Sequence, residues 1–281
     1  MTATAQARGR FVGDGEGGTF ERDGCALRYR IDGPAGAPLV VFSHGATADH
    51  TMFDDQVTAV TARYRMLRWD MRGQGASRPA DPPFSCIRAA EDLAALLDHL
   101  GEDHVALVGQ SIGGNVGQEF IFLYPERAAA ALFLGCTCST GPLSWAERLL
   151  LKLTPAILGL YPLNALRRTA ANGSAVTPAA RERLEAMMAP LSKAEFVVIF
   201  SEIVRGLHSE PGYRIARPIL IAHGEADNLG NIKQAAAPWA ARDGAPAPVV
   251  IPNAGHCANM DNPEAFNRVM MDFLAANYPA A

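Results

Sequence analysis

The sequence lacks the features of a nucleic-acid-binding or membrane-spanning protein. Its 281 residues include 25 Lys and Arg against 29 Asp and Glu, which gives a net charge of −4, and no block of basic residues occurs. Nucleic-acid binders usually carry a basic excess or a basic stripe. No apolar run reaches the roughly 20 residues that a membrane-spanning helix needs. We therefore expect neither a nucleic-acid partner nor a membrane partner.

Cysteine is scarce, and its placement favours neither disulfides nor a metal site. The chain has five cysteines, an odd number, and they are scattered. Cys136 and Cys138 are only two positions apart, which is too close for the usual zinc-binding pair. Residues 1–18 are polar and glycine-rich, without the apolar segment of a signal peptide. We expect a cytoplasmic protein with reduced thiols, a flexible tail at 1–18, and no metal or cofactor. The sequence gives no indication of oligomeric state.

Apolar residues are abundant and arranged for an α/β protein. They make up 49% of the chain, enough for a large core. Short apolar, β-branched runs alternate with helical patterns, which predicts a mostly parallel central sheet flanked by helices. The predicted strands are Leu27–Ile31, Leu39–Phe42, Met66–Trp69, Val105–Val108, Ala131–Leu134, Ile219–Ala222 and Val249–Ile251. The predicted helices of this part are Ile87–Leu100, Ser111–Leu123 and Pro263–Tyr278, with Gly101 as a C-cap and Asn262 as an N-cap.

One long segment interrupts this alternation. Residues 139–214 contain helical patterns without a clear strand between them. The predicted helices are Ser144–Leu153, a stretch near Ile157–Thr169, Pro178–Met188 and Ala194–Gly206. We expect an α/β core formed by 19–138 and 215–281, and an all-helical cap inserted at 139–214.

A G-x-S-x-G motif lies between a predicted strand and a predicted helix. Gly109-Gln110-Ser111-Ile112-Gly113 directly follows the strand Val105–Val108. An abrupt reversal at this point forces the serine into a strained backbone conformation, and the small flanking residues let the strand and helix pack closely. The motif makes Ser111 the candidate nucleophile.

Two later loops supply candidates for a base and an acid. His256 follows the last predicted strand, and Asp227 follows the strand Ile219–Ala222. A carboxylate after one strand can reach a histidine presented after the next, so Asp227 is the expected partner of His256. Glu225 lies on the same loop and is the second choice. Cys257 has no base beside it and is expected to be an inert, packed thiol.

The loop after the strand Leu39–Phe42 is the expected place for backbone donors to an oxyanion. We expect the N–H groups of Ala46 and Ile112 to stabilise negative charge on a tetrahedral intermediate. His44 is expected to be structural, holding this loop by a hydrogen bond. After the strand Met66–Trp69, Asp70 and Arg72 are expected to belong to the architecture of a glycine-rich loop, and a local ion-pair network between them is one possible form of it.

These residues together resemble the α/β-hydrolase superfamily, in its capped esterase and lactonase group. The segments Tyr64–Gly73, Gly109–Gly113 and Gly255–Phe266 are similar to 3-oxoadipate enol-lactonase-like hydrolases. The resemblance implies the α/β-hydrolase fold and the chain order serine, aspartate, histidine. Dehalogenases and epoxide hydrolases of this superfamily have Asp as the nucleophile, so Ser111 argues against both activities.

The expected function is hydrolysis of a small-molecule carboxylic ester or lactone by Ser111, Asp227 and His256. The apolar residues Met187, Met188, Phe196 and Phe200 of the cap are candidates to line the substrate pocket, which favours a hydrophobic substrate over a charged one. Other reactions on the same residues stay open, namely carbon–carbon bond hydrolysis, thioester hydrolysis and cofactor-free perhydrolysis. A ligand-binding receptor with little turnover is the alternative of a different class.

Overall fold

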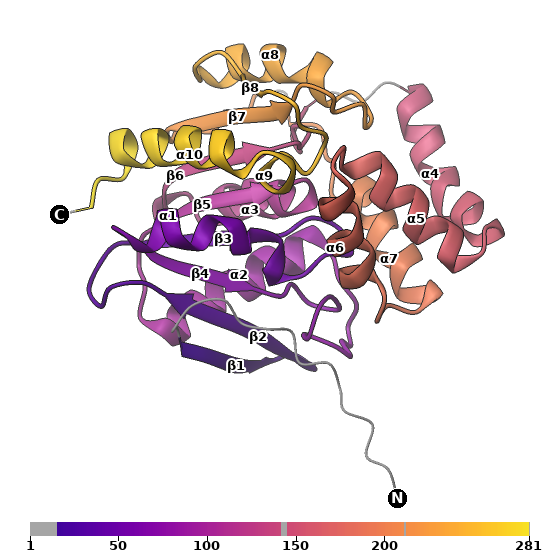
Figure 1. Cartoon of the computed structure of the whole chain (residues 1–281), viewed down its shortest axis with the longest axis horizontal. Coiled ribbons are helices and arrows are strands. Elements are labelled where there is room, and N and C mark those ends of the chain that lie inside the picture. The colour runs from indigo at the N-terminus through magenta and orange to yellow at the C-terminus, as the bar shows by residue number, and fades with distance from the viewer. Residues whose placement is uncertain (1–15, 142–144, 211, 281) are drawn as a thin grey trace, which may run out of the picture.

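A single mostly parallel sheet forms the centre of the molecule (Figure 1). The computed structural model describes residues 16–141, 145–210 and 212–280. The sheet has eight strands in the order β1-β2-β4-β3-β5-β6-β7-β8. β1 and β2 are antiparallel to their neighbours, and the pairs from β4 to β8 are parallel. The strands are β1 Glu16–Arg22, β2 Cys25–Asp32, β3 Leu39–Ser43, β4 Arg65–Trp69, β5 Val105–Gln110, β6 Ala128–Leu134, β7 Ile219–Gly224 and β8 Val249–Ile251.

Helices cover both faces of the sheet. The helices of the core are η1 His50–Gln56, α1 Val57–Thr61, α2 Cys86–Leu100, α3 Ile112–Leu123, η2 Pro125–Arg127, α8 Ile232–Asp243, α9 Ala258–Asp261 and α10 Pro263–Asn277. Alternate residues of each buried strand face opposite helix layers, because side chains alternate along a strand. In β3, Val40 and Phe42 pack in the cluster that includes α1 and α10, whereas Leu39 and Val41 pack in the cluster that includes α2, α3 and α8. The strands therefore read as continuous apolar runs, as strands buried on both faces do.

In the described part of the chain, four helices lie between β6 and β7. They form a helical insertion and are grouped at one side of the sheet (Figure 1). Its helices are α4 Trp145–Leu160, α5 Leu163–Ser174, α6 Pro178–Met188 and α7 Lys193–Arg205. β6 and β7 are direct neighbours, with Ala131 paired to Ile219. The chain thus leaves the sheet at the end of β6 and returns in β7, and the hydrogen bonds between these two strands are not interrupted.

Most expected elements are present, with differences at three places. β1 begins at Glu16, so the expected tail at 1–18 overlaps a strand, and residues 1–15 lie outside the described part. The expected break between the first two cap helices is displaced, because α4 runs through Pro155 to Leu160. α8, which was not expected, contains Pro238. Gly101 and Asn262 cap α2 and α10 as predicted, Gly101 with a φ of 72°.

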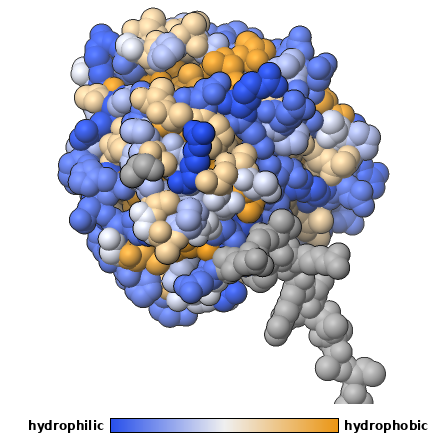
Figure 2. Space-filling model, turned by 60° about the vertical axis from the view of Figure 1, so that its left-hand side comes forward, coloured by the Kyte–Doolittle hydropathy of each residue, from blue (hydrophilic) through white to orange (hydrophobic). Residues whose placement is uncertain are grey.

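The outer surface is mixed in character. The face in Figure 2 is mostly hydrophilic, with hydrophobic residues in separate groups. Among the described residues, no helix is long and apolar enough to cross a membrane. All five cysteines have free thiols, and four of them are buried.

Candidate active site

Ser111 sits at an abrupt turn between β5 and α3. Its φ of 53° and ψ of −123° lie outside the regions that an L-residue ordinarily adopts. The Ser111 N–H donates to the Leu134 carbonyl on β6 at 2.8 Å, and the Ser111 carbonyl accepts from the Gly114 N–H at 2.8 Å. Bonds to the sheet on one side and to the helix on the other hold the strained conformation.

The flanking glycines of the motif are required by close backbone packing. A Cβ on Gly109 would lie 2.5 Å from the Gly113 carbonyl oxygen. A Cβ on Gly113 would lie 2.0 Å from the Ser43 carbonyl oxygen, at the end of β3. The motif therefore lets α3 begin directly against β5 and β3, as the sequence predicts.

His256 and Asp227 meet although they are 29 residues apart. The His256 Nδ1 lies 3.0 Å from Asp227 Oδ2, and both side chains are buried. Because the carboxylate can only accept, Nδ1 carries the proton and Nε2 is left with a free lone pair. The other Asp227 oxygen accepts from the Leu229 N–H at 3.0 Å. The structure thus brings together the expected base and its expected partner.

The environment of Asp227 favours its ionised form. Burial by itself raises the pKa of this carboxyl group, but the hydrogen bond and charge of His256 and the Leu229 N–H outweigh it and lower the pKa below its ordinary value. Glu225, the second choice from the sequence, is exposed and accepts from the Asn253 N–H at 3.0 Å. It lies on the same loop as Asp227, but its hydrogen bond is to Asn253 and not to His256.

The loop after β3 lines the same cavity as Ser111. The Ala48 N–H donates to the Gly45 carbonyl, which closes a turn around Ala46 and Thr47. The Thr47 N–H donates to the Gln74 Oε1 at 2.7 Å. Among the described residues, no partner is found for the Ala46 N–H. Ile112 is the first residue of α3, where backbone N–H groups lack intrahelical partners.

His44 is structural, as the sequence indicates. Its Nε2 accepts from the Met71 N–H at 3.0 Å, and its Nδ1 donates to the Gly45 carbonyl at 2.8 Å. The ring is fully buried, and burial lowers its pKa, which keeps it neutral. With both nitrogens engaged, His44 links the loop after β3 to the loop after β4.

Asp70 and Arg72 hold the loop after β4, but the possible ion pair between them does not form. Asp70 Oδ1 accepts from His50 Nδ1 at 2.8 Å, and Oδ2 accepts from the Ala76 N–H at 2.8 Å. Arg72 instead makes a bidentate ion pair with Asp92 on α2, with N–O distances of 2.7 and 2.8 Å. The two side chains are two residues apart on a loop, and each finds a partner on a different element.

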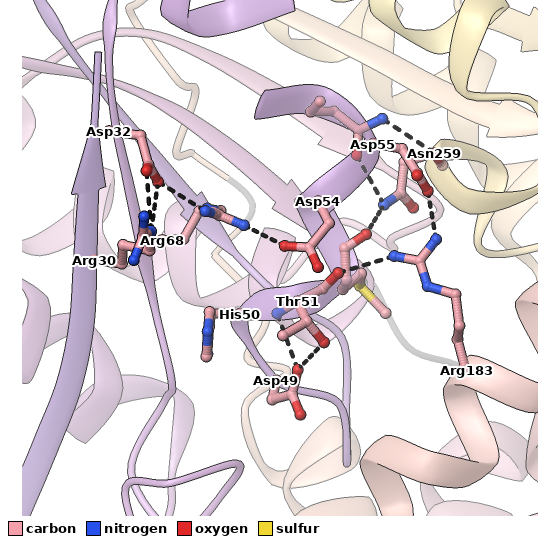
Figure 3. A network of polar contacts seen from close by, with 12 residues as sticks. Arg30, Asp32, Asp49, His50, Thr51, Asp54, Asp55, Arg68, Arg183 and Asn259 are labelled. Atoms are coloured by element: carbon pink, nitrogen blue, oxygen red, sulfur yellow. Dashed lines mark hydrogen bonds and ion pairs between the residues drawn. The ribbon is translucent and has the colours of Figure 1, made fainter. Parts of the chain in front are cut away.

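A polar network around η1 connects the sheet, the helical insertion and α9 (Figure 3). Arg68 on β4 pairs with Asp32 at 2.7 Å and also with Asp54 of η1. Arg183 on α6 pairs with Asp55 at 2.5 Å, and the Asn259 side chain on α9 donates to the Met52 carbonyl at 3.0 Å. These bonds fix the element that follows the Ala46 loop.

One group in this region has the residue types of a metal site. Asp49, His50 and Asp70 each place a ligand atom within 4.8 Å of the others. Three of the four carboxylate oxygens already accept hydrogen bonds, however: Asp49 Oδ1 accepts from the Thr51 N–H at 2.9 Å, and the two Asp70 oxygens accept from His50 and from the Ala76 N–H. Burial opposes protonation of His50, but the hydrogen bond to Asp70 raises its pKa above the ordinary value. The geometry is that of an ion pair within a loop.

Ser111 and His256 open into one cavity of about 80 Å³. Gly45 to Ala48 form one wall of it. The helical insertion forms another, with Leu184 and Met188 of α6 and Phe200 and Ile203 of α7. Among the described residues that line the cavity, none is Lys, Arg, Asp or Glu.

Two of the four apolar residues expected to line this cavity do so. Met188 and Phe200 line it, whereas Met187 and Phe196 lie in the core beside it. Phe196 is one helical turn before Phe200 and stacks on it with ring centroids 4.6 Å apart. Met187 points to a different side of α6 from Met188, because neighbouring helical residues are about 100° apart.

Sequence reasoning missed three residues that shape the site. Gln110 Nε2 donates to the His256 carbonyl at 3.1 Å, and Gln74 holds the Ala46 loop. Gly135 has a φ of 57°, and a Cβ there would lie 3.1 Å from His256 Nδ1. Of these three residues, only Gly135 could have been singled out from the sequence, because it directly follows a predicted strand.

The sequence of residues 40–269 matches the model of the alpha/beta hydrolase family. The chain belongs to this family. Among curated relatives, this alpha/beta hydrolase is 27% identical to 2-(acetamidomethylene)succinate hydrolase of Mesorhizobium japonicum, over 85% of this chain and 88% of the relative. It is 24% identical to 3-oxoadipate enol-lactonase 2 of Acinetobacter baylyi, over 90% of this chain and 94% of the relative.

The fold of this alpha/beta hydrolase also matches solved structures. A thermophilic esterase from Thermogutta terrifontis superposes with a TM-score of 0.78 at 20% identity, covering 94% of this chain and 99% of that one. The family identifies a hydrolase that acts on a small molecule. The expected α/β-hydrolase fold is confirmed.

Proposed function

We propose that this alpha/beta hydrolase cleaves a carboxylic ester or lactone through an acyl-enzyme on Ser111. The observation that carries the proposal is the convergence of the strained Ser111 and the His256–Asp227 pair at one cavity. A serine, a base within the same cavity and a carboxylate that orients the base are the parts that nucleophilic acyl transfer needs.

In the proposed mechanism, Ser111 Oγ attacks the substrate carbonyl carbon while His256 Nε2 accepts the hydroxyl proton. The Ala46 and Ile112 N–H groups stabilise the oxyanion. His256 returns the proton to the leaving alkoxide as the carbon–oxygen bond breaks, which leaves an acyl ester on Ser111. His256 then deprotonates a water that attacks this ester, and the acid is released as Ser111 regains its proton. Asp227 stabilises the imidazolium at both stages.

We further propose that the acyl group is small and uncharged and that the helical insertion caps the site. The cavity of about 80 Å³ has apolar walls from α6 and α7, and no Lys or Arg is among the described residues that line it. The names of the two curated relatives refer to succinate and oxoadipate, which carry carboxylates. A carboxylate in the present cavity would lose hydration without gaining a Lys or Arg partner among the described lining residues, which is unfavourable.

Ser111→Ala tests the proposed nucleophile with p-nitrophenyl acetate and butyrate. Turnover by the variant is expected to fall at least about 10⁴-fold, and mass spectrometry of the wild-type protein is expected to detect an acyl group on Ser111. Ser209→Ala, at an exposed serine, is the control and should keep full activity. Wild-type turnover in Ser111→Ala would refute the proposed function.

The preference for an uncharged acyl group is tested with two esters of similar size, p-nitrophenyl butyrate and p-nitrophenyl hemisuccinate. p-Nitrophenyl hemisuccinate has nearly the shape of the butyrate ester but ends in a carboxylate. We expect kcat/KM to be at least about tenfold higher for butyrate. Equal or higher kcat/KM for the hemisuccinate would contradict a neutral acyl group while leaving Ser111 as the nucleophile.

A further inference from the structure

The loop that carries His256 is tied to its surroundings on both sides of the histidine. On one side, the Cys257 N–H donates to the Ser174 carbonyl of the helical insertion at 2.7 Å. On the other side, the Gly255 N–H donates to Asp261 Oδ2 at 2.9 Å. Asp261 is the last residue of α9, so its carboxylate reaches back over the turn that follows His256.

The same carboxylate also binds the helical insertion. Asp261 Oδ2 accepts from the Val176 N–H at 2.9 Å, and Oδ1 accepts from the Thr177 N–H and the Thr177 hydroxyl at 2.8 Å each. Val176 and Thr177 connect α5 to α6. One side chain therefore joins the His256 loop to the link between two helices of the insertion.

This link is close to the substrate cavity. Ala170, Ala171 and Ser174, on the α5 face that precedes it, line the cavity together with His256. The two segments are packed tightly, since a Cβ on Gly255 would lie 3.2 Å from the Ser174 carbonyl oxygen. The position of the cavity wall and the position of His256 are thus set by the same contacts.

We propose that Asp261 is a positioning residue, which holds the His256 loop against the α5–α6 link so that the imidazole stays aligned with Ser111. The proposal rests on the proposed role of His256 as the base. Asp261 lies outside the cavity lining and acts through Gly255 and Thr177, without touching the substrate.

An ionised carboxylate suits this role better than an amide. All the groups that meet the Asp261 oxygens are donors, and a carboxylate presents only acceptors. Hydrogen bonds to a charged acceptor are also shorter and stronger than neutral ones. An asparagine of the same size would turn its NH₂ group towards one of these donors. The buried Gly255 N–H or the Thr177 N–H would then lose its partner.

Asp261→Asn tests the proposal with p-nitrophenyl butyrate, with rates expressed per active serine titrated by a fluorophosphonate. A small displacement of a catalytic group lowers the rate steeply, so kcat is expected to fall by about ten- to a hundredfold. KM is expected to change by less than about threefold, because the residues that line the cavity are unchanged and the Ser174 carbonyl keeps its bond from the Cys257 N–H. Glu264→Gln is the matched control. Glu264 lies three residues after Asp261, its side chain is 91% exposed, and the substitution removes the same charge.

The control defines the result that would overturn the proposal. A kcat for Asp261→Asn within about twofold of that for Glu264→Gln would show that Asp261 does not position the base. A loss that disappears once rates are expressed per titrated serine would likewise refute it, because the variant would then only fold less completely. Failure of the proposed function is distinguishable, since Ser111→Ala would then retain activity.

Discussion

Ser111 adopts its backbone conformation because its neighbours leave no alternative. A non-glycine residue in a sparsely populated region costs about 1–3 kcal/mol and persists only where surrounding structure enforces it. The hydrogen bond to Leu134 and the close packing of Gly113 against β3 supply that enforcement. The proposed nucleophile thereby lies at the cavity on a turn that is held from both sides.

Asp227→Asn is expected to lower kcat by about 10⁴-fold for p-nitrophenyl butyrate. The amide can no longer favour the His256 tautomer that has its proton on Nδ1, and it cannot stabilise the imidazolium. Thermal unfolding should show that the variant is folded, because asparagine keeps the size of the side chain.

Glu225→Gln is the matched control for this prediction. Glu225 is on the same loop, but its bond is to Asn253 at the surface. Its kcat is expected to stay within about twofold of wild type. A large loss in Glu225→Gln together with a small loss in Asp227→Asn would reverse the assignment of the acid.

The sequence predicts residues that a contiguous motif or the order of the loops singles out, and it fails where neither indicates the partner. Ser111 is recognisable because the strand, the turn and the glycines are contiguous. Gln110 is contiguous with it too, but its partner is the His256 carbonyl, 146 residues away. The wrong pairing of Asp70 with Arg72 has the same cause, since the partner of Arg72 lies on α2 and only the folded chain brings it near.

The helical insertion is attached to the core by charged contacts as well as by apolar packing. Glu195 on α7 makes a two-pronged pair with Arg78 after β4, at 2.8 Å for both bonds. The same carboxylate accepts from the Ser192 N–H and hydroxyl in a capping box that begins α7. The bond from Arg78, followed by those from Ser192, lowers the pKa of Glu195 from 4.5 to about 2 against the opposing effect of burial.

This depressed pKa predicts how acid affects the attachment. A carboxyl group with a lower pKa in the folded state stabilises that state above its ordinary pKa of 4.5, and the contribution is lost as the pH falls from 4.5 towards 2. The difference in Tm between wild type and Glu195→Gln is therefore expected to shrink between about pH 6 and about pH 3. A difference that is constant over this range would exclude the ion pair as its source.

Elements with strong apolar runs are predictable from the sequence, and those without them are not. β3 and β5 are buried on both faces and read as uninterrupted hydrophobic stretches. β1 is polar and glycine-containing, and its strand conformation comes from antiparallel pairing with the edge of β2. α8 contains a proline, which usually ends a helix, so its local sequence argues against the helix that packing on β7 stabilises.

At the scale of the whole molecule, Arg72 joins segments that are far apart in the chain. Besides Asp92 on α2, its guanidinium donates to the carbonyls of Arg22 and Asp23 in the β1–β2 turn and of Pro82. Both Arg72 and Asp92 are completely buried. A buried charge that loses its partner costs more than the pair contributes, because its desolvation is no longer compensated.

Asp92→Ala is therefore expected to lower the free energy of unfolding by about 3–5 kcal/mol, measured by urea denaturation. Asp98→Ala on the same helix removes an exposed partner of Arg127 and should cost less than about 1 kcal/mol. Similar losses in the two variants would show that burial of the Arg72 pair does not determine its contribution.

The adjacency of β6 and β7 has a consequence for how substrate preference can evolve. β6 and β7 are hydrogen-bonded neighbours, and the His208 N–H donates to the Ser139 carbonyl at 2.8 Å. The two ends of the insertion therefore lie close together whatever its length. The entropic cost of closing a longer loop rises only slowly with its length. Descendants of this protein can therefore lengthen, shorten or exchange the four helices while the strands that carry Ser111 and Asp227 keep their register. Selection can thus reshape the cavity wall that the insertion supplies, provided that the α5–α6 link keeps its contacts with the His256 loop.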